Sequence, residues 1–173
     1  MAENTSNLLW GPVENFRDLL AANAAFQALC GVSGEEDPTA AAHAHIYCPA
    51  LPGDTYKTAR PWALVGHGGT WKTKRLSSTG WERSGQVACI LEVAVPEAHA
   101  GRSVEKLAAA EQWFLAALGD IIEGLMDASA AAGALAISGI EIVDGPSRPP
   151  QEIENDEGDF YQTVLAVDWG IGE

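Results

Sequence analysis

The feature that most constrains the fold is a nearly unbroken run of apolar residues in the middle of the chain. Residues 85–95 read GQVACILEVAV, and several of them are β-branched. β-branched residues favour strands, and an apolar run without alternation is typical of a strand buried on both faces. The run therefore predicts a strand in the centre of a sheet.

Two amphipathic helices are expected, one before and one after this strand. Apolar residues recur at three- and four-residue spacing over residues 12–30, where Gly11–Pro12 opens the helix and Gly31 ends it. The same spacing continues over residues 103–129, with Ser103 at the start. Each predicted helix has one apolar stripe, so we expect both to cover one face of the sheet.

The remaining patterns predict a short helical turn and further strands. The turn follows Asp37–Pro38, and residues 66–69 are expected to form a flexible break between two strands. Strands are predicted at residues 45–48, 60–65, 71–75, 134–143 and 160–169. The expected fold class is α+β: a single domain, residues 1–173, with a mixed or antiparallel sheet covered on one face by two helices. Residues 1–11 and 145–158 are expected to be flexible.

Charge is distributed unevenly along the chain. The protein has 24 acidic and 10 basic side chains and a net charge of −14, which argues against nucleic-acid binding because phosphate contact needs a basic surface. Eight basic and four acidic residues fall within 57–106, whereas one basic and thirteen acidic residues fall within 107–173. Opposite charge balances in two segments are compatible with contact between copies of the chain, and equally with a soluble acidic protein that has no such contact. We expect a soluble cytoplasmic protein, because the sequence has neither a membrane-spanning apolar stretch nor a secretory signal pattern.

The cysteines give no support for a metal or redox site. Cys30, Cys48 and Cys89 are far apart, and the chain has no CxxC motif. A reducing compartment is therefore expected.

Three histidines lie in sequence patterns that metal sites or active sites can use. His43 and His45 form an HxH pair that would face one way on a strand, but no third ligand lies nearby in the sequence. His67–Gly68–Gly69 is similar to the oxyanion turn of esterases, yet the chain has no GxSxG motif for a nucleophile. Phosphate-binding glycine motifs are also absent. We therefore expect no catalytic set, no cofactor and no metal.

Basic and aromatic residues gather in one segment, and acidic residues gather in another. The first set consists of Lys57, Arg60, Lys72, Lys74, Arg75 and Arg83, with Trp62, Trp71 and Trp81 among them. Trp and Arg are common anchors of protein interfaces, and the acidic remainder of the chain favours a protein partner over a nucleic acid. The second set lies in a Pro-rich loop: Glu152, Glu154, Asp156, Glu157 and Asp159. A weak cation site in this loop stays open, although its spacing does not match an EF-hand.

These two sets predict an interface. A basic hairpin is expected to contact an acidic patch on a second copy or on another protein of the assembly through Trp71, Lys72, Lys74, Arg75, Trp81 and Arg83, and the expected patch is the acidic loop.

Two phrases of the sequence, together with the order of the elements, carry a family resemblance. Residues 60–65 read RPWALV and residues 85–96 read GQVACILEVAVP. Over residues 12–170 the chain resembles the tail-terminator and minor tail (head–tail joining) proteins of long-tailed bacteriophages and prophages. The resemblance implies a structural protein without catalytic residues that forms a ring, commonly of six subunits. Such a ring caps the tail tube and presents a surface to the head connector.

The resemblance also implies partners and a location. The partners would be other copies of the chain, the tail tube and the head-connector proteins. The basic hairpin would contact an acidic patch on the next subunit or on the tail tube. The location would be the virion tail, with the host cytoplasm during assembly.

Two other functions remain open from the sequence. One is a small hydrolase that uses His67 with Ser84 or Cys89 as the nucleophile. The other is an acidic binding module that holds a basic protein partner through residues 151–159.

Overall fold

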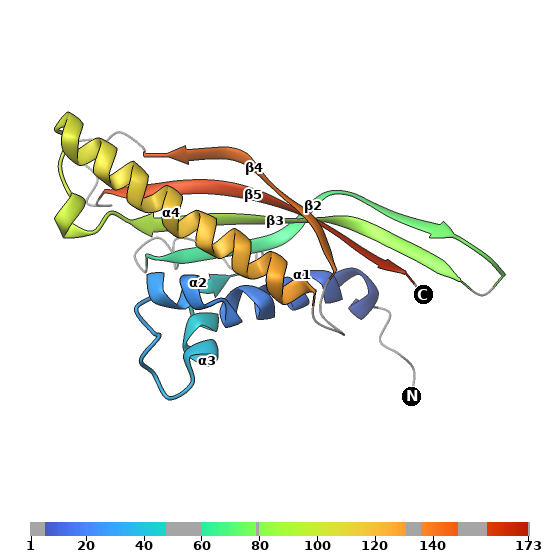
Figure 1. The fold of residues 1–173 in the computed structure, drawn as a ribbon. Coiled ribbons are helices and arrows are strands. Elements are labelled where there is room, and N and C mark those ends of the chain that lie inside the picture. Colours follow the sequence, from blue (N-terminus) through green and yellow to red (C-terminus); the bar gives the residue numbers. More distant parts are fainter. Residues whose placement is uncertain (1–5, 48–59, 79, 131–135, 149–158, 173) are drawn as a thin grey trace.

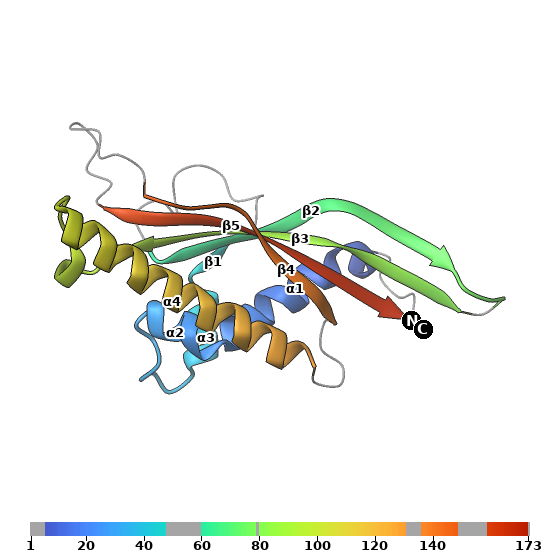
Figure 2. The ribbon, with the colours of Figure 1, turned by 45° about the horizontal axis from the view of Figure 1, so that its top comes forward.

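The fold consists of one mixed sheet with helices against one face (Figure 1, Figure 2). The computed structural model describes residues 6–47, 60–78, 80–130, 136–148 and 159–172. The five strands lie in the order β1-β2-β3-β5-β4 and comprise β1 (Ile46–Tyr47), β2 (Trp62–Arg75), β3 (Trp81–Ala94), β4 (Ile137–Ser147) and β5 (Phe160–Gly172). β1 is parallel to β2, and the other neighbours are antiparallel. The predicted α+β class and single domain are confirmed.

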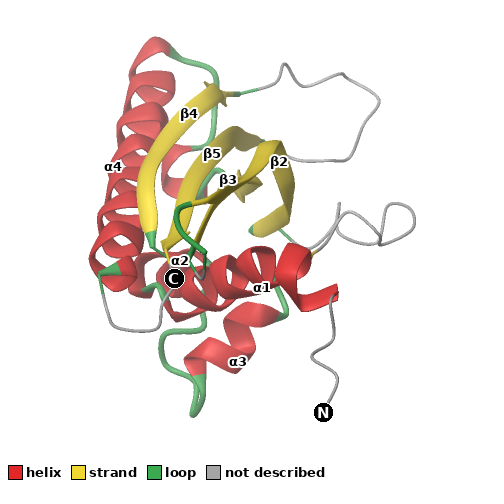
Figure 3. Ribbon diagram, turned by 90° about the vertical axis from the view of Figure 1, so that its right-hand side faces the viewer, coloured by secondary structure: helices red, strands yellow, loops and turns green. Residues whose placement is uncertain are grey.

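The helices form two groups beside the sheet. They are α1 (Ser6–Ala22), α2 (Ala24–Leu29), α3 (Pro38–His43) and α4 (Val104–Ser129), and a 3-10 turn (Glu97–His99) precedes α4. Figure 3 shows α4 running along one side, with α1, α2 and α3 gathered at the bottom of the view. The predicted turn after Asp37–Pro38 is α3, and its first turn is capped by the Asp37 carboxylate, which accepts from the Ala40 N–H at 2.9 Å.

β3 is the central strand, as the sequence predicts. It pairs with β2 on one side and with β5 on the other. Alternate side chains of β3 are buried in the core, namely Val87, Cys89, Leu91 and Val93. The apolar run therefore places the middle of the sheet against the helices.

α4 has the predicted extent and supplies the largest helical share of the core. The Ser103 hydroxyl caps the helix by accepting from the Lys106 N–H at 3.3 Å. Its buried stripe consists of Ala110, Phe114, Leu118, Ile121 and Leu125. The Phe114 ring stacks on the Tyr161 ring of β5, with ring centroids 4.9 Å apart.

The single helix predicted over residues 12–30 is wrong. The chain forms two helices there, because Asn23 has an extended backbone and caps α2 by accepting from the Phe26 N–H at 3.0 Å. The Asn23 amide also donates to the Ile121 carbonyl at 3.0 Å, which ties this break to α4. A Cβ on Gly124 would lie 2.6 Å from the Asn23 amide nitrogen, so glycine permits this close approach.

The start of the first helix also differs from the prediction. α1 begins at Ser6, so Pro12 lies inside the helix and not at its first position. The Trp10 ring contacts the His67 ring of β2, with centroids 5.5 Å apart, and this contact stabilises the earlier turns. Residues 1–11 are expected to be flexible, but residues 6–11 belong to α1. Residues 1–5 lie outside the described residues.

The flexible break predicted at residues 66–69 is wrong as well. β2 continues through these residues, and its register with β3 shifts between Gly68 and Lys72. Gly69 has a φ of +53°, so the glycines form a bulge within one strand. The two predicted strands are therefore a single long one.

β4 also extends further than the sequence predicts. The Thr163 hydroxyl of β5 donates to the Asp144 carbonyl at 3.0 Å, and pairing continues to Ser147. The first residues of the segment 145–158 thus belong to a strand, whereas residues 149–158 lie outside the described residues.

Candidate assembly surfaces

The distal halves of β2 and β3 form a projecting hairpin, residues 67–86, which we call the arm. Figures 1 and 2 show these strands continuing well past the helices to a tip. The first residues of β2 are mostly buried, whereas residues 72–75 are exposed. β5 pairs with β3 as far as Glu82, so the arm is a three-stranded part of the sheet except at its end, where Arg75 pairs with Trp81.

The structure places the six predicted interface residues of the hairpin on this arm, but on two faces. Lys72 pairs across from Ser84, and Lys74 pairs across from Glu82. Paired residues share a face, so Lys72 and Lys74 lie on one face of the arm. Arg83, Arg75 and Trp81 lie on the other face. A partner that contacts only one face of the arm therefore meets two or three of these six residues.

The tip of the arm, which we define as Arg75, Leu76 and Trp81, combines apolar surface with positive charge. The Arg75 guanidinium donates to the Ser77 and Ser78 carbonyls at 2.9 and 3.1 Å. It also lies 5.6 Å from the centre of the Trp81 ring. Leu76 is 56% exposed and Trp81 is 42% exposed. The tip therefore has two exposed apolar side chains beside a guanidinium group.

Trp71 has a different role from Trp81. It lies at the base of the arm, half-buried, and its ring contacts the rings of His67 and Trp169 at centroid distances of 4.6 and 5.1 Å. Its indole N–H donates to the Gln86 carbonyl at 3.2 Å. Trp71 thus joins the arm to the body of its own chain.

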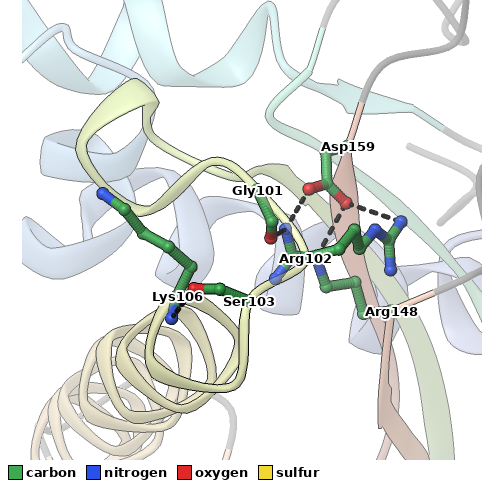
Figure 4. Close-up of polar contacts among 6 residues, drawn as sticks. All are labelled: Gly101, Arg102, Ser103, Lys106, Arg148 and Asp159. Atoms are coloured by element: carbon green, nitrogen blue, oxygen red, sulfur yellow. Dashed lines mark hydrogen bonds and ion pairs between the residues drawn. The ribbon is translucent and has the colours of Figure 1, made fainter.

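Of the five acidic residues predicted to form the other half of the interface, the structure describes only Asp159. Glu152, Glu154, Asp156 and Glu157 lie outside the described residues, whereas Asp159 precedes β5. Figure 4 shows the Asp159 carboxylate between the guanidinium groups of Arg102 and Arg148. Arg102 donates at 3.1 Å and Arg148 donates through Nε at 2.8 Å, with a second bond from its terminal nitrogen.

These contacts make Asp159 part of an intramolecular ion-pair cluster. The side chains of Arg148 and Asp159 are only 6% and 13% exposed. The hydrogen bond from Arg148 lowers the pKa of Asp159, and the same bond raises the pKa of Arg148. Arg148 also donates to the Gly101 carbonyl at 3.0 Å, so the cluster ties β4 and β5 to the segment before α4 (Figure 4). Asp159 already has two cationic partners in its own chain.

A cleft of about 450 Å³ lies near the other end of β2 and β3. Its walls come from α2, α4 and the residues next to the start of β2 and the end of β3. Leu29 and Ala25 line it from α2, and Trp113, Ala117 and Asp120 line it from α4. The walls are mainly apolar, and the carboxylate of Asp120 supplies negative charge at an exposed position. No pattern in the sequence predicts this cleft, because it exists only once α2 and α4 have packed together.

The two histidines of the HxH pair serve separate contacts. His43 ends α3, and its Nε2 lies 3.2 Å from the Asp18 carboxylate. His45 Nδ1 donates to the Pro61 carbonyl, 2.8 Å away. Within the described ranges, no group of three or more His, Cys, Asp or Glu side chains is arranged to hold a metal ion.

The three residues considered for a hydrolase have different surroundings in the structure. Burial raises the pKa of the Cys89 thiol to about 12, so the thiol is protonated at neutral pH. His67 packs between the rings of Trp10 and Trp71. Ser84 lines a polar pocket of about 280 Å³ between the arm and the strands β4 and β5, together with Lys72 and Asp168.

Comparison with known proteins assigns no family. The chain matches no protein-family model and no curated protein sequence. Among the helices that the structure describes, none is long and apolar enough to cross a membrane.

Proposed function

We propose that this protein is a non-enzymatic structural protein that assembles with copies of itself into a ring. The ring would cap the tail tube of a phage or prophage and join it to the head connector. The observation that carries the proposal is the arm, in which β2 and β3 continue past the helices and end in Arg75, Leu76 and Trp81, two of them large exposed apolar side chains.

An arm of this kind is costly to leave unpartnered. Exposed Trp and Leu side chains at the end of the arm gain free energy when a partner buries them, and Trp and Arg dominate the energy of many interfaces. A net charge of −14 further suits a ring through which DNA passes without being held, because acidic side chains repel phosphate. Both properties support assembly over binding to nucleic acid.

The proposal is tested by measuring mass and shape together. Light scattering across a range of protein concentrations should give masses above that of the 18.2 kDa monomer, and electron microscopy should show closed rings. Mixing the protein with purified tail tubes should place these rings at one end of each tube. A protein that remains monomeric at high concentration, alone and with tubes, would overturn the proposal.

A further inference from the structure

The tip of the arm and the cleft lie at opposite ends of the same pair of strands. The cleft is lined by Pro61 and Ala94, which adjoin the start of β2 and the end of β3, whereas Arg75 and Trp81 close the other end. β2 has 14 residues, so these two features are separated by roughly 45 Å along the strands. Figure 1 shows the same arrangement, with α2 and the first half of α4 far from the tip. One chain therefore cannot place its own tip in its own cleft.

We propose that the tip of one copy occupies the cleft of a second copy, so that copies join head to tail. This inference rests on the proposed self-assembly and specifies the surfaces that carry it. A contact between two different patches repeats from copy to copy and closes into a ring when the rotation between copies permits.

The chemistry of the tip matches that of the cleft. The tip offers Leu76 and Trp81, which are exposed and apolar, and the cleft offers walls from Leu29, Trp113 and Ala117. Burial of these side chains would supply most of the association energy. A volume of about 450 Å³ falls in the range of roughly 300–1,000 Å³ that is typical of pockets for small apolar groups.

The charges of the two surfaces are also complementary. Arg75 and Lys74 give the end of the arm a positive charge, and Asp120 gives the cleft a negative one. Lys74 is exposed, and Asp120 is exposed on α4, so the pair can meet at the edge of the apolar contact. An exposed pair of this kind sets orientation and register more than affinity.

Site-specific photo-crosslinking tests the contact directly. Leu76 is replaced by p-benzoylphenylalanine, the assembled protein is irradiated, and the joined peptides are identified by mass spectrometry. We expect a crosslinked dimer in which position 76 is joined to residues 113–120 or 25–29. The same photoreactive residue in place of Leu115, which is exposed on another face of α4, is the matched control and should give no link to the arm tip.

The outcomes separate this inference from the proposed function. A link from position 76 to another surface of the second copy overturns the cleft as the docking site and leaves self-assembly intact. The absence of both crosslinked dimer and any mass above the monomer overturns both.

A charge exchange provides an independent test. Lys74→Glu and Asp120→Lys should each weaken association by about two- to fivefold, the range of an exposed ion pair, and the double variant should regain most of the loss. Glu111→Lys makes the same charge change on the opposite side of α4 and should leave association unchanged. Failure of the double variant to recover overturns the pairing. If Glu154→Lys and Glu157→Lys restore the association that Lys74→Glu weakens, the arm contacts the acidic loop. That result would overturn the cleft as the docking site.

Discussion

β2 and β3 pass through two regions that differ sharply although the strands are continuous. In the body of the domain, Val65, Val87 and Leu91 are buried beneath the helices. In the arm, residues 72–75 of the same sheet are exposed. Backbone pairing is present in both regions, so pairing alone does not decide whether a strand forms core. The side chains decide it, because only the apolar halves of β2 and β3 gain free energy when helices pack against them.

The boundary between the two regions is built from aromatic rings. Trp71 and Trp169 meet around Gly85, where a Cβ would lie 2.9 Å from the Trp71 ring and 3.0 Å from the Trp169 ring. Glycine at this position therefore allows the rings to close the end of the core. Substitutions in the body, at its edge, at this boundary and in the arm should have progressively smaller effects on folding.

The largest effect is expected in the body. Leu118→Asp should destabilise the protein by at least about 4 kcal/mol and prevent folding, because a carboxylate would be buried without a partner between α4 and the sheet. Circular dichroism and thermal melting measure the change. Leu115→Asp on the same helix is the control, and its side chain is exposed, so its melting temperature should stay near that of the unmodified protein. Equal melting of both variants would contradict the assignment of the buried face.

The next effect is expected at the ion-pair cluster of the body. Asp159→Asn should cost about 1–3 kcal/mol, because Arg148 would be left nearly buried beside a neutral amide. The pKa of Asp159 is lowered in the folded state, so its ionised form stabilises the fold above about pH 4 and loses that effect as the pH falls through the lowered pKa. Urea unfolding at pH 7 and at pH 2–3 should show the difference between the two proteins shrinking in acid. If the difference in unfolding free energy between the two proteins does not depend on pH, the charge of Asp159 is not its cause.

A smaller effect is expected at the boundary. Gly85→Ala should destabilise the protein by about 1 kcal/mol, because the methyl group must displace the half-buried Trp71 ring. Tryptophan fluorescence should shift at the same time, since the Trp71 and Trp169 rings separate. Gly170→Ala, where the nearest atom is 3.9 Å from the added carbon, is the control without a close contact. Unchanged fluorescence in Gly85→Ala would show that the rings do not close the core.

The smallest effect on folding is expected in the arm. Lys72→Glu with Lys74→Glu should change the free energy of unfolding by no more than about 0.5 kcal/mol, because both side chains are exposed. The double variant should nevertheless assemble less, and added salt should weaken assembly of the unmodified protein, because the screening length falls from ~30 Å at 0.01 M to ~3 Å at 1 M. Light scattering across a salt series measures both. Unchanged mass in the variant would exclude this face of the arm from assembly.

Sequence patterns identified the elements whose signals are local. Ser103 and the apolar stripe to Met126 predicted α4, Asp37–Pro38 predicted α3, and the apolar run predicted β3. The break at Asn23 was hidden, because the apolar spacing continues on both sides and the residue is explained only by its bond to α4. The glycines at 66–69 indicated irregular backbone, but only pairing with β3 shows that the strand continues through a bulge.

The surfaces were predictable only where they depend on one hairpin. The basic and aromatic residues of the arm stood out in the sequence because they are close together along the chain. The separate role of Trp71 depends on Trp169, nearly a hundred residues away, and the cluster around Asp159 depends on Arg102, which arrives from another part of the fold. The cleft depends on how α2 meets α4, which no pattern of either helix records.

The continuity of β3 from the core to the tip has a mechanical consequence. β3 is hydrogen-bonded to β5 from Glu82 to Ala94, and antiparallel bonds lie perpendicular to the strands. A pull on the tip along the strand direction therefore loads these bonds in shear, all at once, and does not open them one after another. The arm has no linker at its base that could extend first. Tension applied at one end of the domain is thus carried by its whole central strand.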